Sequence, residues 1–248
     1  SSILNQPTAE YYMVAVDEQY PYRLYMPQQD NSTLIIPSIP PVSWGFEHPS
    51  QAWQQASGCE TGQIWPTPDG KVVWGACKGE VGRYNVVTGQ EKHYWVYPQN
   101  RYGHDPDDIK FRFPRQTVVY VSPHDSRVIY QASHVLHRSL DEGVTWDIIS
   151  PELSRPAPET PASVGERQPP DAAQKRGVIY ALAPSGVQRG LLWAGTDDGL
   201  IWRTDDEGAH WQEVTPAGLT AWSKVTQIEA SHFDLRTAYA SVSRLRVD

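Results

Sequence analysis

The chain has 248 residues, which is enough for one all-β domain of ordinary size. Its formal net charge of −8 argues against nucleic-acid binding, which needs a basic face, and it gives no reason to expect binding to an anionic membrane surface. Ten Trp and 13 Tyr residues, together with 21 Pro and 18 Gly, are typical of many short strands joined by turns, and no apolar run is long enough to span a membrane.

The first strands are predicted at residues 9–16, 22–25 and 34–36, where apolar runs are separated by polar or Pro-containing segments. A dense polar cluster lies between the second and third of these runs and consists of Gln28, Gln29, Asp30 and Asn31. This cluster is either a solvated turn or a binding loop that offers amide and carboxylate groups. Residues 37–57 are predicted to form a long irregular loop that packs through its aromatic side chains.

Four apolar runs between residues 62 and 97 predict one complete four-stranded blade. Cys59 and Cys77 lie 18 residues apart, in segments that we expect to be neighbouring strands. A disulfide and a pair of free buried thiols are both compatible with this spacing. If the disulfide forms, an exported location follows, because the cytosol keeps thiols reduced.

Two long segments between strands follow this blade. Residues 98–116 form a charged loop in which Asp105, Asp107 and Asp108 match no calcium-binding spacing, so we predict no metal site. Residues 151–177 carry six prolines among polar residues and are interpreted as an inserted loop.

One eight-residue pattern occurs twice, as SLDEGVTW at 139–146 and TDDEGAHW at 204–211. Each copy lies between strand-like runs. The members shared by the two copies are Ser139, Asp141, Gly143 and Trp146 in the first, and Thr204, Asp206, Gly208 and Trp211 in the second. The hydroxyl and carboxylate can bond loop N–H groups, glycine can take a positive φ, and tryptophan can fold back over the strands. The repetition predicts a structural role for these residues.

The repeated pattern resembles the Asp box, or BNR repeat, which is found in sialidases, in the sortilin ectodomain and in other β-propellers. Further phrases resemble sortilin-like bacterial repeat-type glycosyl hydrolases. They are PYRLY at 21–25, QQDNS at 28–32, Gly62, FRF at 111–113, SPHD at 122–125, ISPEL at 149–153 and WAGTDDG at 193–199. The resemblance implies four-stranded blades arranged radially. It implies little about activity, because these families share the turn and not the chemistry.

The fold class that follows is all-β: a β-propeller of four-stranded antiparallel blades with Asp-box turns, and roughly four blades plus part-blades. Strands in corresponding positions are predicted to begin near Arg23, Val72, Val128, Leu191 and Thr237. Residues 1–248 are expected to be either a single propeller domain or a segment of a larger propeller.

The favoured functional hypothesis is a non-catalytic, exported scaffold or accessory subunit that docks on a larger assembly, including a membrane complex, through protein partners. We expect the protein to be periplasmic or extracellular and to need no cofactor. The candidate binding-loop residues are Gln28, Gln29, Asp30, Asn31, Glu60, Arg112, His124 and Asp125.

Two other functions stay open. A glycoside hydrolase would need two facing carboxylates, and no spacing selects a pair among Asp30, Glu60, Asp125 and Asp198. A sialidase would also need three convergent arginines, and nothing marks Arg23, Arg112 and Arg138 as convergent. A carbohydrate-binding propeller could instead stack sugar rings on Trp44, Trp53, Trp65 or Trp95, unless these side chains pack between blades.

Overall fold

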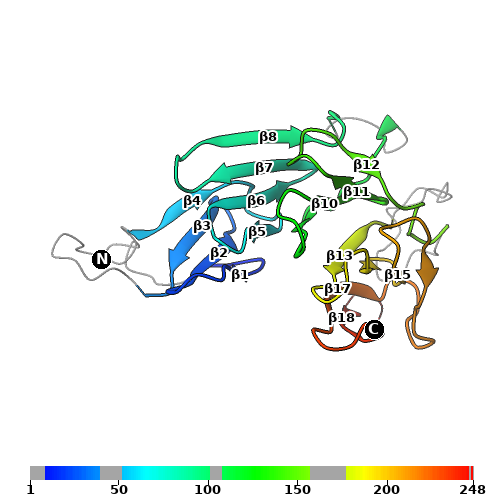
Figure 1. The fold of residues 1–248 in the computed structure, drawn as a ribbon. Helices are drawn as coiled ribbons and strands as arrows, with labels where there is room; N and C mark the ends of the chain where they lie inside the picture. Colours follow the sequence, from blue (N-terminus) through cyan, green and yellow to red (C-terminus); the bar gives the residue numbers. More distant parts are fainter. Residues whose placement is uncertain (1–8, 40–51, 101–107, 157–176, 246, 248) are drawn as a thin grey trace.

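The computed structural model describes residues 9–39, 52–100, 108–156, 177–245 and 247 (Figure 1). The described strands form four four-stranded sheets and one two-stranded sheet, and within each sheet neighbouring strands follow one another in the chain. All of these strand pairs are antiparallel.

Each sheet is one blade. The first consists of β1 (Ala15–Val16), β2 (Arg23–Pro27), β3 (Thr33–Pro37) and β4 (Gln54–Ala56). The second consists of β5 (Ile64–Pro66), β6 (Val72–Cys77), β7 (Glu80–Asn85) and β8 (Glu91–Trp95). The third consists of β9 (Val118–Val121), β10 (Ile129–Ala132), β11 (Leu136–Ser139) and β12 (Asp147–Ile148). The fourth consists of β13 (Ile179–Pro184), β14 (Leu192–Thr196), β15 (Ile201–Thr204) and β16 (Gln212–Glu213). The last sheet pairs β17 (Lys224–Ala230) with β18 (Ala238–Ser243).

The blades follow one another in an arc, with the first sheet and the last sheet at its two ends (Figure 1). Each apolar cluster lies between two successive blades, so the core is divided among the interfaces. The alternation of side chains along β10 explains why the core is divided. Ile129 belongs to the cluster shared with the second blade, and Tyr130 to the cluster shared with the fourth. Because the third blade is covered on both faces, β10 is buried at every residue.

The predicted fold class is confirmed. The second strand of each sheet begins at Arg23, Val72, Ile129, Leu192 and Ala238, within one residue of the predicted starts. Runs of apolar residues indicated these starts in the first four blades, where the second strand is largely buried. The second strand of the last sheet, β18, is mostly exposed.

Two predictions of local structure are wrong. Residues 37–57 were expected to be irregular, but Gln54–Ala56 form β4, which pairs with Thr33, Leu34 and Ile35. The strand was missed because Gln54 and Gln55 are exposed at a sheet edge and give no apolar signal. The expected strand at residues 9–16 is also too long, since only Ala15–Val16 enter the sheet and the preceding residues pair irregularly with β2 and the turn after it.

Some predicted features lie outside the described residues, namely Trp44, Asp105, Asp107 and most of the 151–177 insertion. Within the part of the chain that the structure describes, no helix has the length and apolarity to cross a bilayer.

Candidate functional site

Antiparallel pairing sorts the connections onto two faces of the arc. Turns between the first and second strands of a blade, and between its third and fourth strands, lie at one end of the sheet. We call this end the turn face. Connections between the second and third strands, and those that join one blade to the next, lie at the opposite end, which we call the linker face. The predicted site residues divide between these two faces.

The first repeated turn joins β11 to β12 on the turn face. The Ser139 hydroxyl donates to Asp141 Oδ1 at 2.8 Å and accepts from the Gly143 N–H at 2.7 Å. Asp141 Oδ1 also accepts from the Thr145 N–H at 2.8 Å, and this bond holds the pKa of Asp141 below its ordinary value. Trp146 Nε1 donates to the Gly143 carbonyl at 2.9 Å. All four repeated side chains or backbone groups therefore bond within the turn.

The second repeated turn joins β15 to β16 in the same way. The Thr204 hydroxyl donates to Asp206 Oδ1 at 2.8 Å and accepts from the Gly208 N–H at 3.1 Å. Asp206 Oδ1 accepts from the His210 N–H at 2.9 Å, and hydrogen bonds from His210 lower the pKa of Asp206 to about 2. Both carboxylate oxygens of Asp206 are thus bonded to groups of the same turn, which indicates a structural role for this residue.

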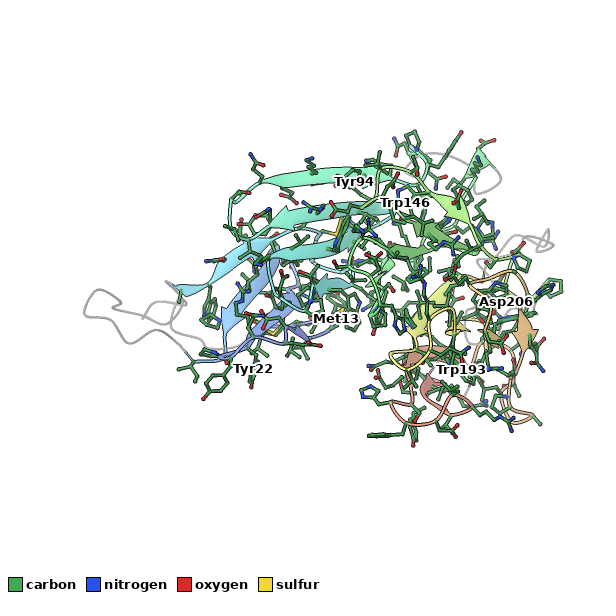
Figure 2. All side chains as sticks on the ribbon, viewed as in Figure 1. Met13, Tyr22, Tyr94, Trp146, Trp193 and Asp206 are labelled. Carbon is green, nitrogen blue, oxygen red and sulfur yellow. A yellow bond between two sulfur atoms is a disulfide. The ribbon has the colours of Figure 1, made fainter. Side chains whose placement is uncertain are left out.

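Both repeated turns pack against the preceding blade. Trp211 Nε1 donates to the Ile149 carbonyl of the third blade at 2.8 Å, and a Cβ on Gly208 would lie 2.2 Å from that carbonyl oxygen. Trp146 packs on the cluster that contains Tyr94 of the second blade, and Figure 2 shows these two side chains near each other. A Cβ on Gly143 would lie 3.1 Å from the Tyr94 ring. The repeated turns thus fasten successive blades.

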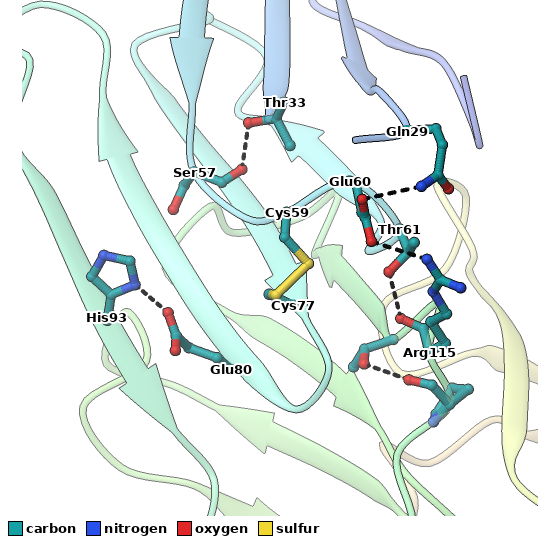
Figure 3. Close-up of a disulfide and its surroundings, with 12 residues drawn as sticks. Gln29, Thr33, Ser57, Cys59, Glu60, Thr61, Cys77, Glu80, His93 and Arg115 are labelled. Atoms are coloured by element: carbon teal, nitrogen blue, oxygen red, sulfur yellow. Dashed lines mark hydrogen bonds and ion pairs between the residues drawn. A yellow bond between two sulfur atoms is a disulfide. The ribbon is translucent and has the colours of Figure 1, made fainter. Parts of the chain in front are cut away.

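On the linker face, part of the predicted polar cluster converges on Glu60 (Figure 3). Glu60 Oε2 accepts from the Asp30 N–H at 3.0 Å and from Gln29 Nε2 at 3.2 Å, and Glu60 Oε1 accepts from Arg115 at 3.0 Å. The Asp30 N–H, followed by Arg115, lowers the pKa of Glu60. Sequence reasoning missed Arg115. Its place in the connection between the second and third blades, on the same face as the loop of Glu60, was the available signal.

The remaining members of the polar cluster, Gln28 and Asn31, form the turn itself, because the Asn31 N–H donates to the Gln28 carbonyl at 3.1 Å. Next to Glu60, a disulfide joins Cys59 to Cys77 with the Cα atoms 5.1 Å apart (Figure 3). The disulfide ties Cys59, in the connection between the first two blades, to Cys77 at the end of β6. It therefore fixes the loop that carries Glu60 to the second blade.

Arg112, His124 and Asp125 do not join this site. The Arg112 guanidinium contacts Glu152 and donates to the Gly177 carbonyl at 3.1 Å, which links other connections of the linker face. His124 and Asp125 lie on the turn face. Hydrogen bonds from Arg127 lower the pKa of Asp125 to about 2. The eight predicted binding-loop residues are therefore divided among separate places on both faces.

The candidate carboxylates and arginines are also separated. Asp198 is buried and accepts from the Thr196 hydroxyl at 2.5 Å and from the Arg155 N–H at 2.7 Å. Burial raises the pKa of its neighbour Asp197 to about 6. Of the arginines, Arg23 pairs with Asp17 in the first blade, whereas Arg138 pairs with a glutamate of the fourth blade.

A central pocket of about 360 Å³ is lined by residues from the first strands of the blades or from the segments just before them. The Trp65 and Tyr120 rings lie 4.1 Å apart between centroids, and burial raises the pKa of Tyr120 to about 12. Tyr12 and Tyr180 add aromatic surface. Three amide side chains, Gln63, Gln116 and Gln227, also line the pocket. Of the proposed sugar platforms, Trp65 therefore lies in a pocket, whereas Trp53 and Trp95 are exposed in or beside fourth strands.

Sequence comparison identifies no relatives: no family model and no curated protein matches the chain. Solved structures are similar in fold. The β-propeller domain of Cps50 (Swd1) from Myceliophteria thermophila aligns with a TM-score of 0.55 at 12% identity, over 92% of this chain and 62% of that one. Two COPII coat structures on membranes, one described as the outer coat vertex, align with TM-scores of 0.56 at 7% identity. Each covers 94% of this chain, and the chain covers 58% and 32% of theirs.

These likenesses show that the chain has a β-propeller fold. The chain spans less than two thirds of the length of each of these structures.

Proposed function

We propose that this protein is a non-catalytic, exported scaffold or accessory subunit that binds a protein partner within a larger assembly. The observation that carries the proposal is an apolar surface on the first blade, on the side facing away from the second blade. Its most exposed members are Val16 at 55% and Tyr22 at 46%. Clustered exposed apolar side chains mark interaction surfaces in soluble proteins.

Strand register places Val16 on one face of the first sheet with two half-buried apolar residues. Val16 lies opposite Leu24, and Leu24 lies opposite Ile36, so these three side chains share a side of the sheet. Ala15 and Tyr25 point to the other side and pack against the second blade. Figure 2 shows Tyr22 at the margin of the first sheet. This partly exposed face therefore follows from the alternation of side chains along β1 and β2.

The neighbouring β1–β2 turn is held in place and adds a further aromatic ring. Asp17 is buried, and its carboxylate accepts from the Arg23 N–H at 3.0 Å, from Arg23 Nε at 2.9 Å and from the Tyr25 hydroxyl at 2.8 Å. Tyr20, in the same turn, is 92% exposed. Because the turn that carries Tyr20 is already fixed, a partner does not have to order its backbone, and tyrosine is a common anchor in protein interfaces.

Three further observations support the proposal. The candidate acids Glu60, Asp125 and Asp198 each bond neighbouring protein N–H groups, as expected for structural residues. The disulfide supports export, because such bonds persist in oxidising compartments. The solved structures of similar fold include components of the COPII coat assembled on membranes. We further infer that the repeated turns are Asp boxes of the BNR type in a sortilin-like propeller, since their bonding pattern explains each repeated residue.

The test is native purification of the protein with its assembly, followed by sedimentation. We expect the wild-type protein to migrate well above 27.9 kDa and the Tyr20→Ser/Tyr22→Ser variant to lose its partner while keeping its unfolding temperature. The matched control is Tyr239→Ser on β18, a 68% exposed residue at the other end of the arc. Wild-type migration as a lone chain, or a double variant that retains the partner, would contradict the proposal.

The central pocket favours a second candidate function, the binding of a neutral carbohydrate. Aromatic rings beside amide groups suit sugar faces and hydroxyls, and Glu229 is the one acidic side chain among the described residues that line the pocket. A glycoside hydrolase would need a second carboxylate there. Glycan-array binding that Gln63→Leu/Gln227→Leu abolishes would support this function, and array binding unchanged in that variant would exclude this pocket.

A further inference from the structure

A three-residue contact recurs between successive blades on the turn face. An aromatic residue on the second strand of a blade lies opposite an arginine on the third strand, and the arginine pairs with a glutamate from the next blade. In the second blade, Trp74 lies opposite Arg83, and the guanidinium lies 5.8 Å from the ring centroid. Arg83 pairs at 3.1 Å with Glu142, which lies in the first repeated turn of the third blade.

The next interface has the same arrangement. In the third blade, Tyr130 lies opposite Arg138, and Arg138 pairs at 3.3 Å with Glu207 in the second repeated turn of the fourth blade. Glu142 and Glu207 both have positive φ angles, 56° and 59°, and each precedes a glycine with a positive φ. This shared backbone shape directs the carboxylate to the arginine and seats the glycine against the preceding blade.

The fourth blade carries the first two members of a third copy. Trp193 lies opposite Arg203, with the guanidinium 5.6 Å from the ring centroid. Within the described residues, Arg203 pairs at 3.3 Å with Asp205 of the same blade, and the Asp205 side chain is 58% exposed. The turn that supplies the glutamate elsewhere joins a third strand to a fourth, and the last described sheet has only β17 and β18.

A groove of about 820 Å³ lies where those two strands would pack. Its lining includes Trp193, Ile201, Arg203 and Val214 from the fourth blade and Ala240 and Val242 from β18. Trp193 marks this region in Figure 2. One edge of β18 pairs with β17, and no described strand pairs with the other edge. The groove therefore combines an apolar floor, an arginine and an open strand edge.

We propose that this groove binds a β-hairpin whose turn contains Asp-Glu-Gly followed two residues later by Trp. The hairpin adds to the open edge of β18 by main-chain hydrogen bonds, its glutamate pairs with Arg203, and its glycine lies against Trp193. The product is a four-stranded fifth blade. The occupant follows from the two complete interfaces, where a hairpin of this chemistry already covers an aromatic–arginine pair. This surface is at the opposite end of the arc from the proposed partner surface of the first blade, so the two proposals stand independently.

The binding test uses the intact chain and a fluorescent peptide with the sequence of residues 200–216, which contains Glu207, Gly208 and Trp211. Anisotropy should show saturable binding. Replacing Arg203 in the protein by glutamine should weaken peptide binding about tenfold, and so should replacing Glu207 in the peptide by glutamine. Both replacements together should weaken binding little more than either one alone, because they remove the same ion pair. The matched control is Arg127→Gln, an exposed arginine of the turn face that pairs within its own turn.

A fusion provides the second measurement, because an isolated hairpin is marginally stable in water. A second copy of residues 200–216 is attached after Asp248 through a flexible linker, which raises its effective concentration at the groove. The fusion should raise the urea midpoint of the chain, and Glu→Gln in the added turn should reverse most of that gain.

The proposal is overturned if the fusion leaves the midpoint unchanged and no peptide binding is seen up to about 1 mM. It is also overturned if Arg203→Gln binds the peptide as tightly as the wild-type protein. Sedimentation of the chain as a dimer that the peptide cannot dissociate would show that a second copy occupies the β18 edge instead.

Discussion

Gly208→Ala tests whether the repeated turns fasten one blade to the next. Gly208 has a φ of +94°, and a Cβ at this position would lie 2.2 Å from the Ile149 carbonyl oxygen in the preceding blade. Gly89 occupies the corresponding place in the turn of the second blade. Its φ is +71°, and nothing lies within 4 Å of the Cβ that alanine would add. The two glycines thus share the backbone conformation and differ in the contact.

The expected magnitudes follow from this difference. Holding alanine at a positive φ costs about 1–2 kcal/mol of unfolding free energy, and Gly89→Ala should lose only that amount. Gly208→Ala should lose about 2–4 kcal/mol in total, because overlap with the neighbouring backbone adds about 1–2 kcal/mol. Gly143→Ala should fall between them, since its Cβ would lie 3.1 Å from the Tyr94 side chain, which can shift.

The assay is urea unfolding followed by tryptophan fluorescence, with the slope and midpoint measured for each variant. Equal losses for Gly208→Ala and Gly89→Ala would refute the reasoning. In that case the turns would require glycine only for their own conformation, and the contact with the preceding blade would contribute nothing to stability.

Three further predictions follow from local contacts. Reduction of the Cys59–Cys77 bond should lower the unfolding free energy by about 3 kcal/mol, measured by urea unfolding with and without reductant, with the double serine variant as control. Burial lowers the pKa of His137 to about 3, so the unfolded chain binds the extra proton and stability falls as the pH drops below 6.5. From about pH 7 to about pH 4.5 this loss should be about 2–3 kcal/mol, and His137→Gln should remove it; an unchanged pH slope in that variant would show that other groups cause the loss. Trp211→Phe should cost about 1–2 kcal/mol in thermal unfolding, because it leaves the Ile149 carbonyl without its indole donor, and an unchanged unfolding temperature would contradict this role.

The site was less predictable than the fold. The polar cluster at residues 28–31 was selected from its composition, and two of its members do meet Glu60. Their partner Arg115 could not be selected, because the contact joins connections 55 residues apart in the chain. The same applies to the central pocket, in which each blade contributes a few side chains from its first strand or the segment before it, and none of these stands out locally.

By itself, the sequence determined the β-propeller class, the second strand of each blade and the two repeated turns, because alternation and turn chemistry act over a few neighbouring residues. Tertiary structure alone decided that β4 joins a sheet, since its two glutamines pair through the backbone and carry no apolar signal. It also decided which loops share a face, and that Arg203 lies beside an open groove. These features depend on how whole sheets stack, and stacking is set by contacts between residues that are far apart in the chain.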